Sequence, residues 1–344
     1  MLFSLVIRFV TGFALIVLLA ACDNRNPEII ALEDYRQRIH NILELQQALQ
    51  AFETKRYPAK RELKLTFPEV KMSWSEFFKL TECQQLQQVI AERNNQLGKN
   101  MEEATQLLYE VNLLKSFSQC KQQCVELSEQ QLTAFRTKQM EFKLNVWNNT
   151  WASNYWQSLF SHQRVNRATT KEQMSHLISG ISTLRQRLNS IEEFDAAAFS
   201  SKEWYKAFEI IENSQGLIGS LSFEMQSHIN LLEQINVELD GAKEKICRAN
   251  KKSKEFEYLW NVLNKFYLTD IQKRQAELIN ITSELTAEFD EWQEYFPEHA
   301  EFNSWYQSTF QQDVDSSLSV QLKNQIKQHV VIWQSIQKQC DARE

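Results

Sequence analysis

Proline is almost absent from most of this chain: it occurs only at positions 27, 58, 68 and 297, so none lies between Pro68 and Pro297. Glycine is also scarce, with six residues among 344. Sheets need tight turns that are rich in glycine, proline, asparagine and aspartate. Long stretches without proline that are rich in glutamine, glutamate, leucine and lysine favour helices instead. The sequence therefore predicts an all-α fold, an elongated bundle of long antiparallel helices.

Apolar residues that recur every three or four positions place these helices. Asn26-Pro27 is typical of a helix start, and an apolar stripe follows it from Ile29 to Phe52. Residues 53–72, with two prolines, predict an extended connector. Residues 252–296 predict one long helix that Pro297 stops.

Further stripes predict helices around residues 83–97, 107–127, 142–160, 174–191 and 318–336. Another helix begins near Ser200, is disturbed around Gly216 and Gly219, and ends near Gly241. A boundary between two parts of the body is predicted near residues 195–201.

The N-terminus reads as a secretory leader. Residues 1–21 carry one charge, Arg8, and Phe9–Ala21 is apolar apart from two residues. This matches the short apolar region of a signal peptide and is too short for a membrane-spanning helix. The leader ends in a motif that resembles the lipobox of bacterial lipoprotein precursors, formed by Leu19, Ala20, Ala21 and Cys22. We predict a signal peptide at 1–21, lipid on Cys22, a tether at 22–28 and a helical body at 29–344.

Asp23 and Asn24 predict where the lipoprotein is retained. They resemble the signal that keeps enterobacterial lipoproteins on the periplasmic face of the inner membrane, with the outer membrane as the alternative. Several acyl chains give stable anchoring, whereas one chain gives only marginal binding. The membrane is therefore a predicted partner through the lipid.

The charge balance excludes one class of partner. The formal net charge is −6, and the loss of Arg8 with the leader changes it to −7. Binders of nucleic acid carry a basic patch or stripe, so we predict no nucleic-acid partner. An overall electrostatic attraction to anionic lipid is also disfavoured.

Five cysteines remain beyond Cys22, and an oxidising compartment favours their pairing. Cys83, Cys120 and Cys124 lie early on consecutive helical stripes, whereas Cys247 and Cys340 lie late. We predict a Cys83–Cys120 disulfide, with Cys124 as the competing partner, and a Cys247–Cys340 disulfide.

The spacing of Cys120 and Cys124 also suits a metal or redox pair. However, a fourth metal ligand and the Cys-x-x-Cys spacing are both missing from the sequence. We therefore predict no metal and no cofactor.

Motifs for catalysis are absent from the sequence: no phosphate loop, nucleophile elbow or His-Glu-x-x-His motif occurs. Glu224 and His228 share a helix face, which we interpret as a surface pair. An enzyme is therefore the third of our functional hypotheses.

Two clusters could carry function. Arg93 lies on an apolar stripe, with Asn94 beside it and Glu110 and Tyr109 on the next helix. A buried arginine needs a partner, so the cluster is a pocket for an anionic group or, as we prefer, a structural ion pair or an arginine whose stem packs while its head reaches solvent.

The second cluster is aromatic, and its members recur mostly at every fourth position: Trp147, Trp151, Tyr155 and Trp156. Such a stripe can bind a glycan or an apolar ligand, but it more often packs in a core.

Several segments together resemble an uncharacterised bacterial lipoprotein family catalogued as a domain of unknown function. They are Asp34–Arg38, Cys83, Ala91–Asn94, Leu97–Lys99, Leu107–Glu110, Phe266–Tyr267 and Ile271–Gln272. The resemblance implies lipoprotein identity and no particular activity. Our leading hypothesis is a non-enzymatic envelope protein that binds another envelope protein. The alternative is a helical carrier of an apolar or glycan ligand.

Overall fold

The computed structural model confirms the all-α class, and it describes residues 25–66, 84–94, 101–123, 129–192, 201–248 and 251–341. The first half of the described chain contains α2 (Pro27–Leu43), α3 (Lys60–Leu63), α5 (Gln84–Asn94), α7 (Glu103–Gln123), α8 (Glu129–Asn149), α9 (Asn154–Leu159), the 3-10 turn η1 (His162–Arg164) and α10 (Lys171–Glu192). The second half contains α11 (Ser201–Asn213), α12 (Leu217–Gly241), α13 (Lys243–Ile246), α14 (Lys254–Val262), the π-helical segment η3 (Leu263–Ile271), α15 (Gln272–Asp290), the 3-10 turn η4 (Gln293–Tyr295), α16 (Ala300–Thr309) and α17 (Leu318–Cys340).

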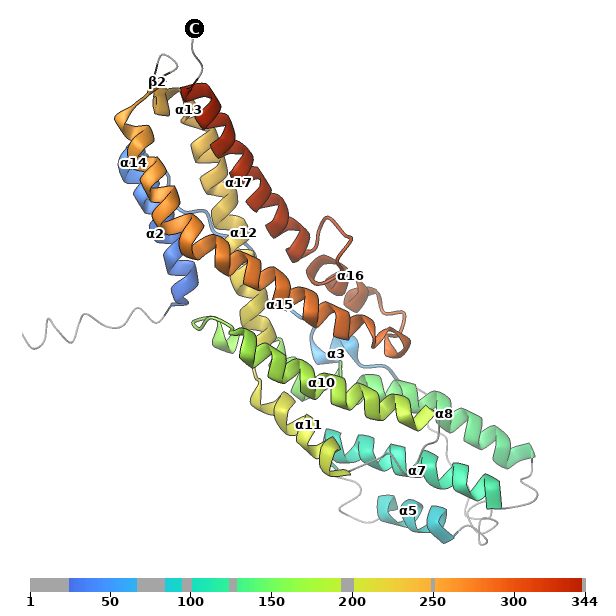
Figure 1. Cartoon of the computed structure of the whole chain (residues 1–344). Coiled ribbons are helices and arrows are strands. Elements are labelled where there is room, and N and C mark those ends of the chain that lie inside the picture. Colours follow the sequence, from blue (N-terminus) through green and yellow to red (C-terminus); the bar gives the residue numbers. More distant parts are fainter. Residues whose placement is uncertain are drawn as a thin grey trace, which may run out of the picture.

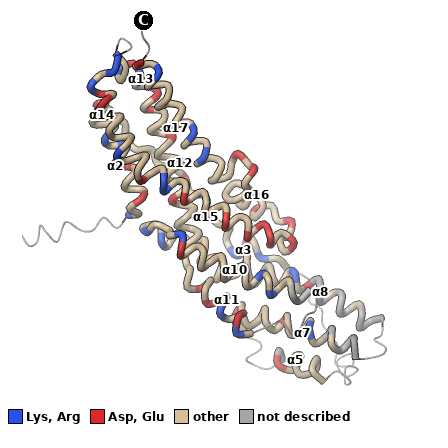
Figure 2. The backbone as a smooth tube through the Cα atoms, in the orientation of Figure 1, with Lys and Arg blue, Asp and Glu red and all other residues tan. Residues whose placement is uncertain are grey.

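The helices form an elongated bundle (Figure 1). The strands β1 (Cys247–Arg248) and β2 (Lys251–Lys252) pair antiparallel in a small hairpin near the C-terminus, with Cys247 opposite Lys252. Acidic and basic residues are interspersed along the body (Figure 2). In the described part of the chain, no helix combines the length and the apolar character needed to cross a bilayer.

Helix α2 begins where the sequence predicts and ends earlier. The Asn26 side chain accepts a hydrogen bond from Glu28 N at 2.9 Å, and Pro27 occupies the first turn. The helix stops at Leu43 because Glu44 adopts a left-handed conformation with φ 51°. The predicted continuation of its stripe to Phe52 is therefore wrong.

The segment after α2 runs extended along α12 instead. Gln50 N donates to Gln234 Oε1 at 3.0 Å, and Asn230 Nδ2 donates to Gln50 O at 3.0 Å. Lys55 N donates to Gln226 Oε1 at 2.7 Å. Side chains of α12 thus satisfy the backbone groups of this segment, and tertiary contacts outweigh its local helix preference. The predicted connector contains the short helix α3, and its residues from 67 onward lie outside the described part.

The predicted long helix near the C-terminus is also largely confirmed. Helical backbone continues from Lys254 to Asp290, but the nine residues of η3 are π-helical. A π segment changes the face that the following turns present. Tyr267 and Ile271 consequently point into one apolar core, whereas Leu278 and Leu285 point into another.

These two cores divide the interior along the long axis. One includes the tryptophans of α8, α9 and α11 with the aromatic residues of α15 and α16. The other lies between α2, α14, η3 and the C-terminal half of α17. Helix α12 contributes to both, as far as Ile229 to the first and from Leu231 to the second. The predicted boundary at residues 195–201 falls mostly outside the described residues, and the helices on its two sides, α10 and α11, pack against one another.

Gly219 allows α12 to approach the preceding chain closely. A Cβ at this position would lie 2.1 Å from Ser161 O and 2.6 Å from Phe160 O, both backbone atoms. Gly219→Ala should therefore destabilise the fold by about 1–3 kcal/mol or more, because the backbone must move. Urea denaturation would measure this loss.

Gly241 provides the matched control for Gly219, because a Cβ there would meet no atom within 4 Å. Gly241→Ala, on the same helix, should be neutral or stabilise by up to about 1 kcal/mol. Equal urea midpoints for the two variants would contradict the tight packing at Gly219.

Candidate functional site

The leader and the lipidation motif (Leu19, Ala20, Ala21, Cys22) lie outside the described residues, as do Asp23 and Asn24. The described chain begins at Arg25, three residues after Cys22. The N-terminal end of α2 lies partway along the bundle and not at either end (Figure 1).

The predicted Cys247–Cys340 disulfide is confirmed. It joins β1 to the last residue of α17, and the two Cα atoms are 4.9 Å apart. Both cysteines are buried in the second core. The other predicted disulfide falls outside the described part, because Cys83, Cys124 and the side chain of Cys120 all lie there.

The aromatic residues singled out in the sequence are divided between the core and the surface. Trp147, Trp151 and Trp156 have no exposed surface. The ring centroids of Trp151 and Trp156 are 4.2 Å apart, and Trp147 Nε1 donates to Leu63 O at 2.7 Å. Tyr155 is partly buried and packs against the same core. The three tryptophans are thus packed in the protein interior.

The arginine cluster is described only in part. Glu110 is buried on α7 and Tyr109 is half-buried beside it. Helix α5, which carries Arg93 and Asn94, packs against α7. The side chains of Arg93 and Asn94 lie outside the described part, so their pairing with Glu110 stays a prediction.

A buried polar network, which sequence reasoning missed, fixes the start of the body. Glu224 on α12 is fully buried and accepts from Arg274 Nε at 2.7 Å and Nη2 at 3.1 Å. Asn26 Nδ2 donates to the second Glu224 oxygen at 3.0 Å, and Arg274 Nη2 also donates to Thr169 O at 2.8 Å. The network therefore joins the N-terminus of α2 to α12, α15 and the loop before α10.

The interpretation of Glu224 and His228 as a surface pair is wrong, since neither side chain is exposed. His228 lies 3.5 Å from Gln275 Nε2, and burial lowers its pKa to about 4. In the sequence, the only sign of this network was the four-residue spacing that places Glu224 and His228 on one helix face. Arg274 neutralises Glu224, and Gln275 contacts His228. Both partners lie on α15, nearly fifty residues further along the chain, so local spacing cannot reveal them.

A second polar cluster lies further along the same helices. Trp333 Nε1 donates to His329 Nε2 at 3.0 Å, so the His329 proton is on Nδ1, which donates to Asn236 Oδ1 at 2.7 Å. Burial lowers the pKa of His329 to about 3, and the ring is neutral. Tyr35, on α2, lies 3.1 Å from the same Nε2.

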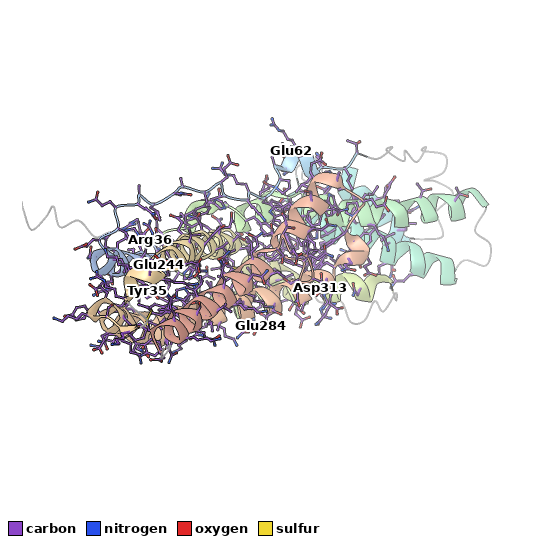
Figure 3. All side chains as sticks on the ribbon, turned by 90° about the horizontal axis from the view of Figure 1, so that it is seen from above. Tyr35, Arg36, Glu62, Glu244, Glu284 and Asp313 are labelled. Carbon is purple, nitrogen blue, oxygen red and sulfur yellow. A yellow bond between two sulfur atoms is a disulfide. The ribbon has the colours of Figure 1, made fainter. Side chains whose placement is uncertain are left out.

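The neighbouring Arg36 also faces α12, and its Nη2 donates to Glu238 Oε1 at 2.5 Å. Tyr35 and Arg36 are seen among the side chains between the helices in Figure 3. Because Asn26, Tyr35 and Arg36 each bond to a side chain on another helix, the two clusters secure α2 against the rest of the body.

An apolar hollow of about 390 Å³ lies beside the N-terminus of α2, where it faces the extended segment after α2 and helix α12. Ile29, Phe52, Phe223 and Leu231 line it, and Arg25 stands at its edge, paired with Glu33 at 2.6 Å. Among the described residues, no group of three His, Cys, Asp or Glu side chains is placed to hold a metal ion.

Together these features define a class: an elongated helical body whose N-terminal helix is fixed by buried polar contacts and whose C-terminus is closed by a disulfide. The chain belongs to the family described as Protein of unknown function (DUF3080), whose model matches residues 32–343. No curated protein and no solved structure matches the chain.

Proposed function

We propose that this protein is a lipoprotein of the bacterial cell envelope, anchored through Cys22, that acts by binding another envelope protein and not by catalysis. The observation that carries the proposal is the Leu19–Cys22 motif placed three residues before Arg25. The Cys247–Cys340 disulfide supports an oxidising compartment.

The short tether gives the anchored body an orientation. Of the predicted tether 22–28, only the three-residue step from Cys22 to Arg25 precedes the part that the body holds, and three residues span about 10 Å at most. Asn26 is buried and bonded to Glu224, so the chain cannot lengthen the tether without breaking that contact. Lipid on Cys22 would therefore hold the surface around Arg25 and the apolar hollow close to the membrane. The bundle then extends on both sides of its attachment point and offers its long faces to a partner.

The test is palmitate labelling and crosslinking mass spectrometry on intact cells, with wild type beside Cys22→Ser. We expect label on the wild type only, a soluble Cys22→Ser protein, and a specific partner that the variant loses. Equal labelling of the variant would refute the anchor. A labelled wild type that crosslinks to no protein would refute the partner and leave the anchor intact.

A further inference from the structure

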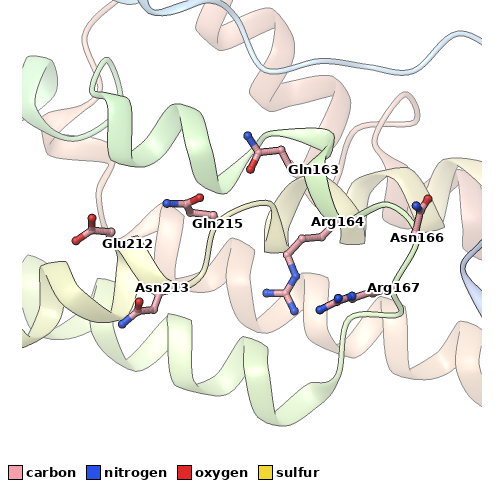
Figure 4. Close-up of a pocket in the computed structure, with 7 residues that line it drawn as sticks. All are labelled: Gln163, Arg164, Asn166, Arg167, Glu212, Asn213 and Gln215. Atoms are coloured by element: carbon pink, nitrogen blue, oxygen red, sulfur yellow. The ribbon is translucent and has the colours of Figure 1, made fainter. Parts of the chain in front are cut away.

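A second cavity, of about 520 Å³, lies where η1 and the turn after it face the connection between α11 and α12. Arg164 and Arg167 line one side of it, and the amides of Asn213 and Gln215 line the other. Figure 4 shows the two guanidinium groups side by side, with Glu212 at the far end of the cavity. All seven lining residues have polar or charged side chains.

Helix α12 holds the turn that carries both arginines in place. The hydroxyl of Ser220, fully buried on α12, lies 2.9 Å from Arg164 O and 2.8 Å from Arg167 O, and its single proton is shared between these two carbonyls. Arg167 N also donates to Arg164 O at 2.9 Å, which closes the turn. Gly216, with φ 71°, sits against Arg164, where a Cβ would lie 3.1 Å from its Cγ. The fold therefore fixes the backbone from which both arginine side chains extend into the cavity.

Neither guanidinium is neutralised within the described part of the chain. Most other arginines described there have a carboxylate oxygen within 4.0 Å, namely Arg25, Arg36, Arg38, Arg61, Arg185, Arg187, Arg248 and Arg274. The chain as a whole is acidic, with net charge −6. Two unpaired cations held together in a concave site attract an anion from outside.

We propose that this cavity binds a phosphate ester that carries hydroxyl groups, such as a phosphoglycerol moiety. Two guanidinium forks match the oxygens of a phosphate group, which a single fork or a lysine matches less well. The cavity is larger than a phosphate ion, and Asn213, Gln215 and Glu212 can hydrogen-bond the hydroxyls of the remainder. A lipid headgroup and a soluble phosphorylated polyol share this chemistry.

The test is isothermal titration calorimetry on the full chain in a non-ionic detergent. The probes are inorganic phosphate, glycerol phosphate, glycerol, dihexanoyl-phosphatidylglycerol and dihexanoyl-phosphatidylcholine. We expect glycerol phosphate or dihexanoyl-phosphatidylglycerol to bind more tightly than inorganic phosphate, glycerol or the choline lipid. A preference for the lipid identifies a headgroup as the source, and a preference for glycerol phosphate identifies a soluble ester.

The matched variants are Arg167→Gln and Arg61→Gln. Arg167 is exposed and contributes only backbone atoms to the hydrogen bonds of the turn, and Arg61 is exposed on α3, outside the cavity. Arg167→Gln should weaken binding roughly ten- to a hundredfold, and Arg61→Gln should bind as wild type does.

Absence of binding by every phosphate probe, or an equal loss in both variants, would overturn the site. Equal affinity for inorganic phosphate and glycerol phosphate would overturn the hydroxyl contacts. None of these outcomes depends on Cys22, so the site can fail while the anchor stands.

Discussion

Arg274→Met is expected to lower the free energy of unfolding by about 3–5 kcal/mol, since it leaves the Glu224 carboxylate buried without its counter-charge. Glu224 is fully buried and takes two hydrogen bonds from this one arginine. Asn26 would remain as a neutral partner, which stabilises a carboxylate far less than a guanidinium does. Urea denaturation followed by far-ultraviolet circular dichroism measures the loss.

The control for this pair is the double variant Glu224→Gln/Arg274→Met. It removes both charges, and the glutamine still presents an oxygen to Asn26. We expect it to recover much of the lost stability, since a buried ion pair contributes little beyond a neutral replacement of similar shape. If the single variant unfolds at the wild-type urea concentration, the pair does not stabilise the junction in the way the structure indicates.

The second large effect is expected from the Cys247–Cys340 disulfide. Its loss in Cys247→Ala/Cys340→Ala should cost about 3–5 kcal/mol, because the bond closes a loop between residues separated by 93 positions. Most of the effect comes from the greater freedom of the unfolded chain. Thermal unfolding of the oxidised protein and of the double variant would show it as a fall in Tm. A variant that melts with the oxidised wild type would mean that the bond does not constrain the unfolded chain.

Features with a local cause could be predicted from the sequence. Asn26-Pro27 starts a helix because the cap and the fixed φ act within one turn. Thr170 and Gln173 cap α10 by reciprocal hydrogen bonds at 3.2 Å, a contact that also lies within one turn. Trp147 and Trp151 pack in a core, as their helical spacing favoured. The Cys247–Cys340 disulfide could be predicted because the other cysteines lie in the first 124 residues of the chain.

Features decided by distant partners could not be predicted. Leu49 and Phe52 fit the stripe of α2, yet side chains of α12 hold this segment in an extended form. Glu224 and His228 look like surface residues until α15 supplies their partners. The cavity beside Arg164 and Arg167 depends on how η1 and the turn after it pack against α12. Gly219 and Ser220 of α12 determine that packing. None of these contacts leaves a periodic trace in the sequence.

The division of the interior into two cores has a consequence for cooperativity. A body as extended as this one could in principle melt section by section from its ends. Three helical runs oppose that route: α12, the run from α14 to α15, and α17 each contribute side chains to both cores. Opening either core would take packing partners from helices on which the other core depends. The shared helices therefore couple the two cores into one unfolding unit, despite the length of the molecule.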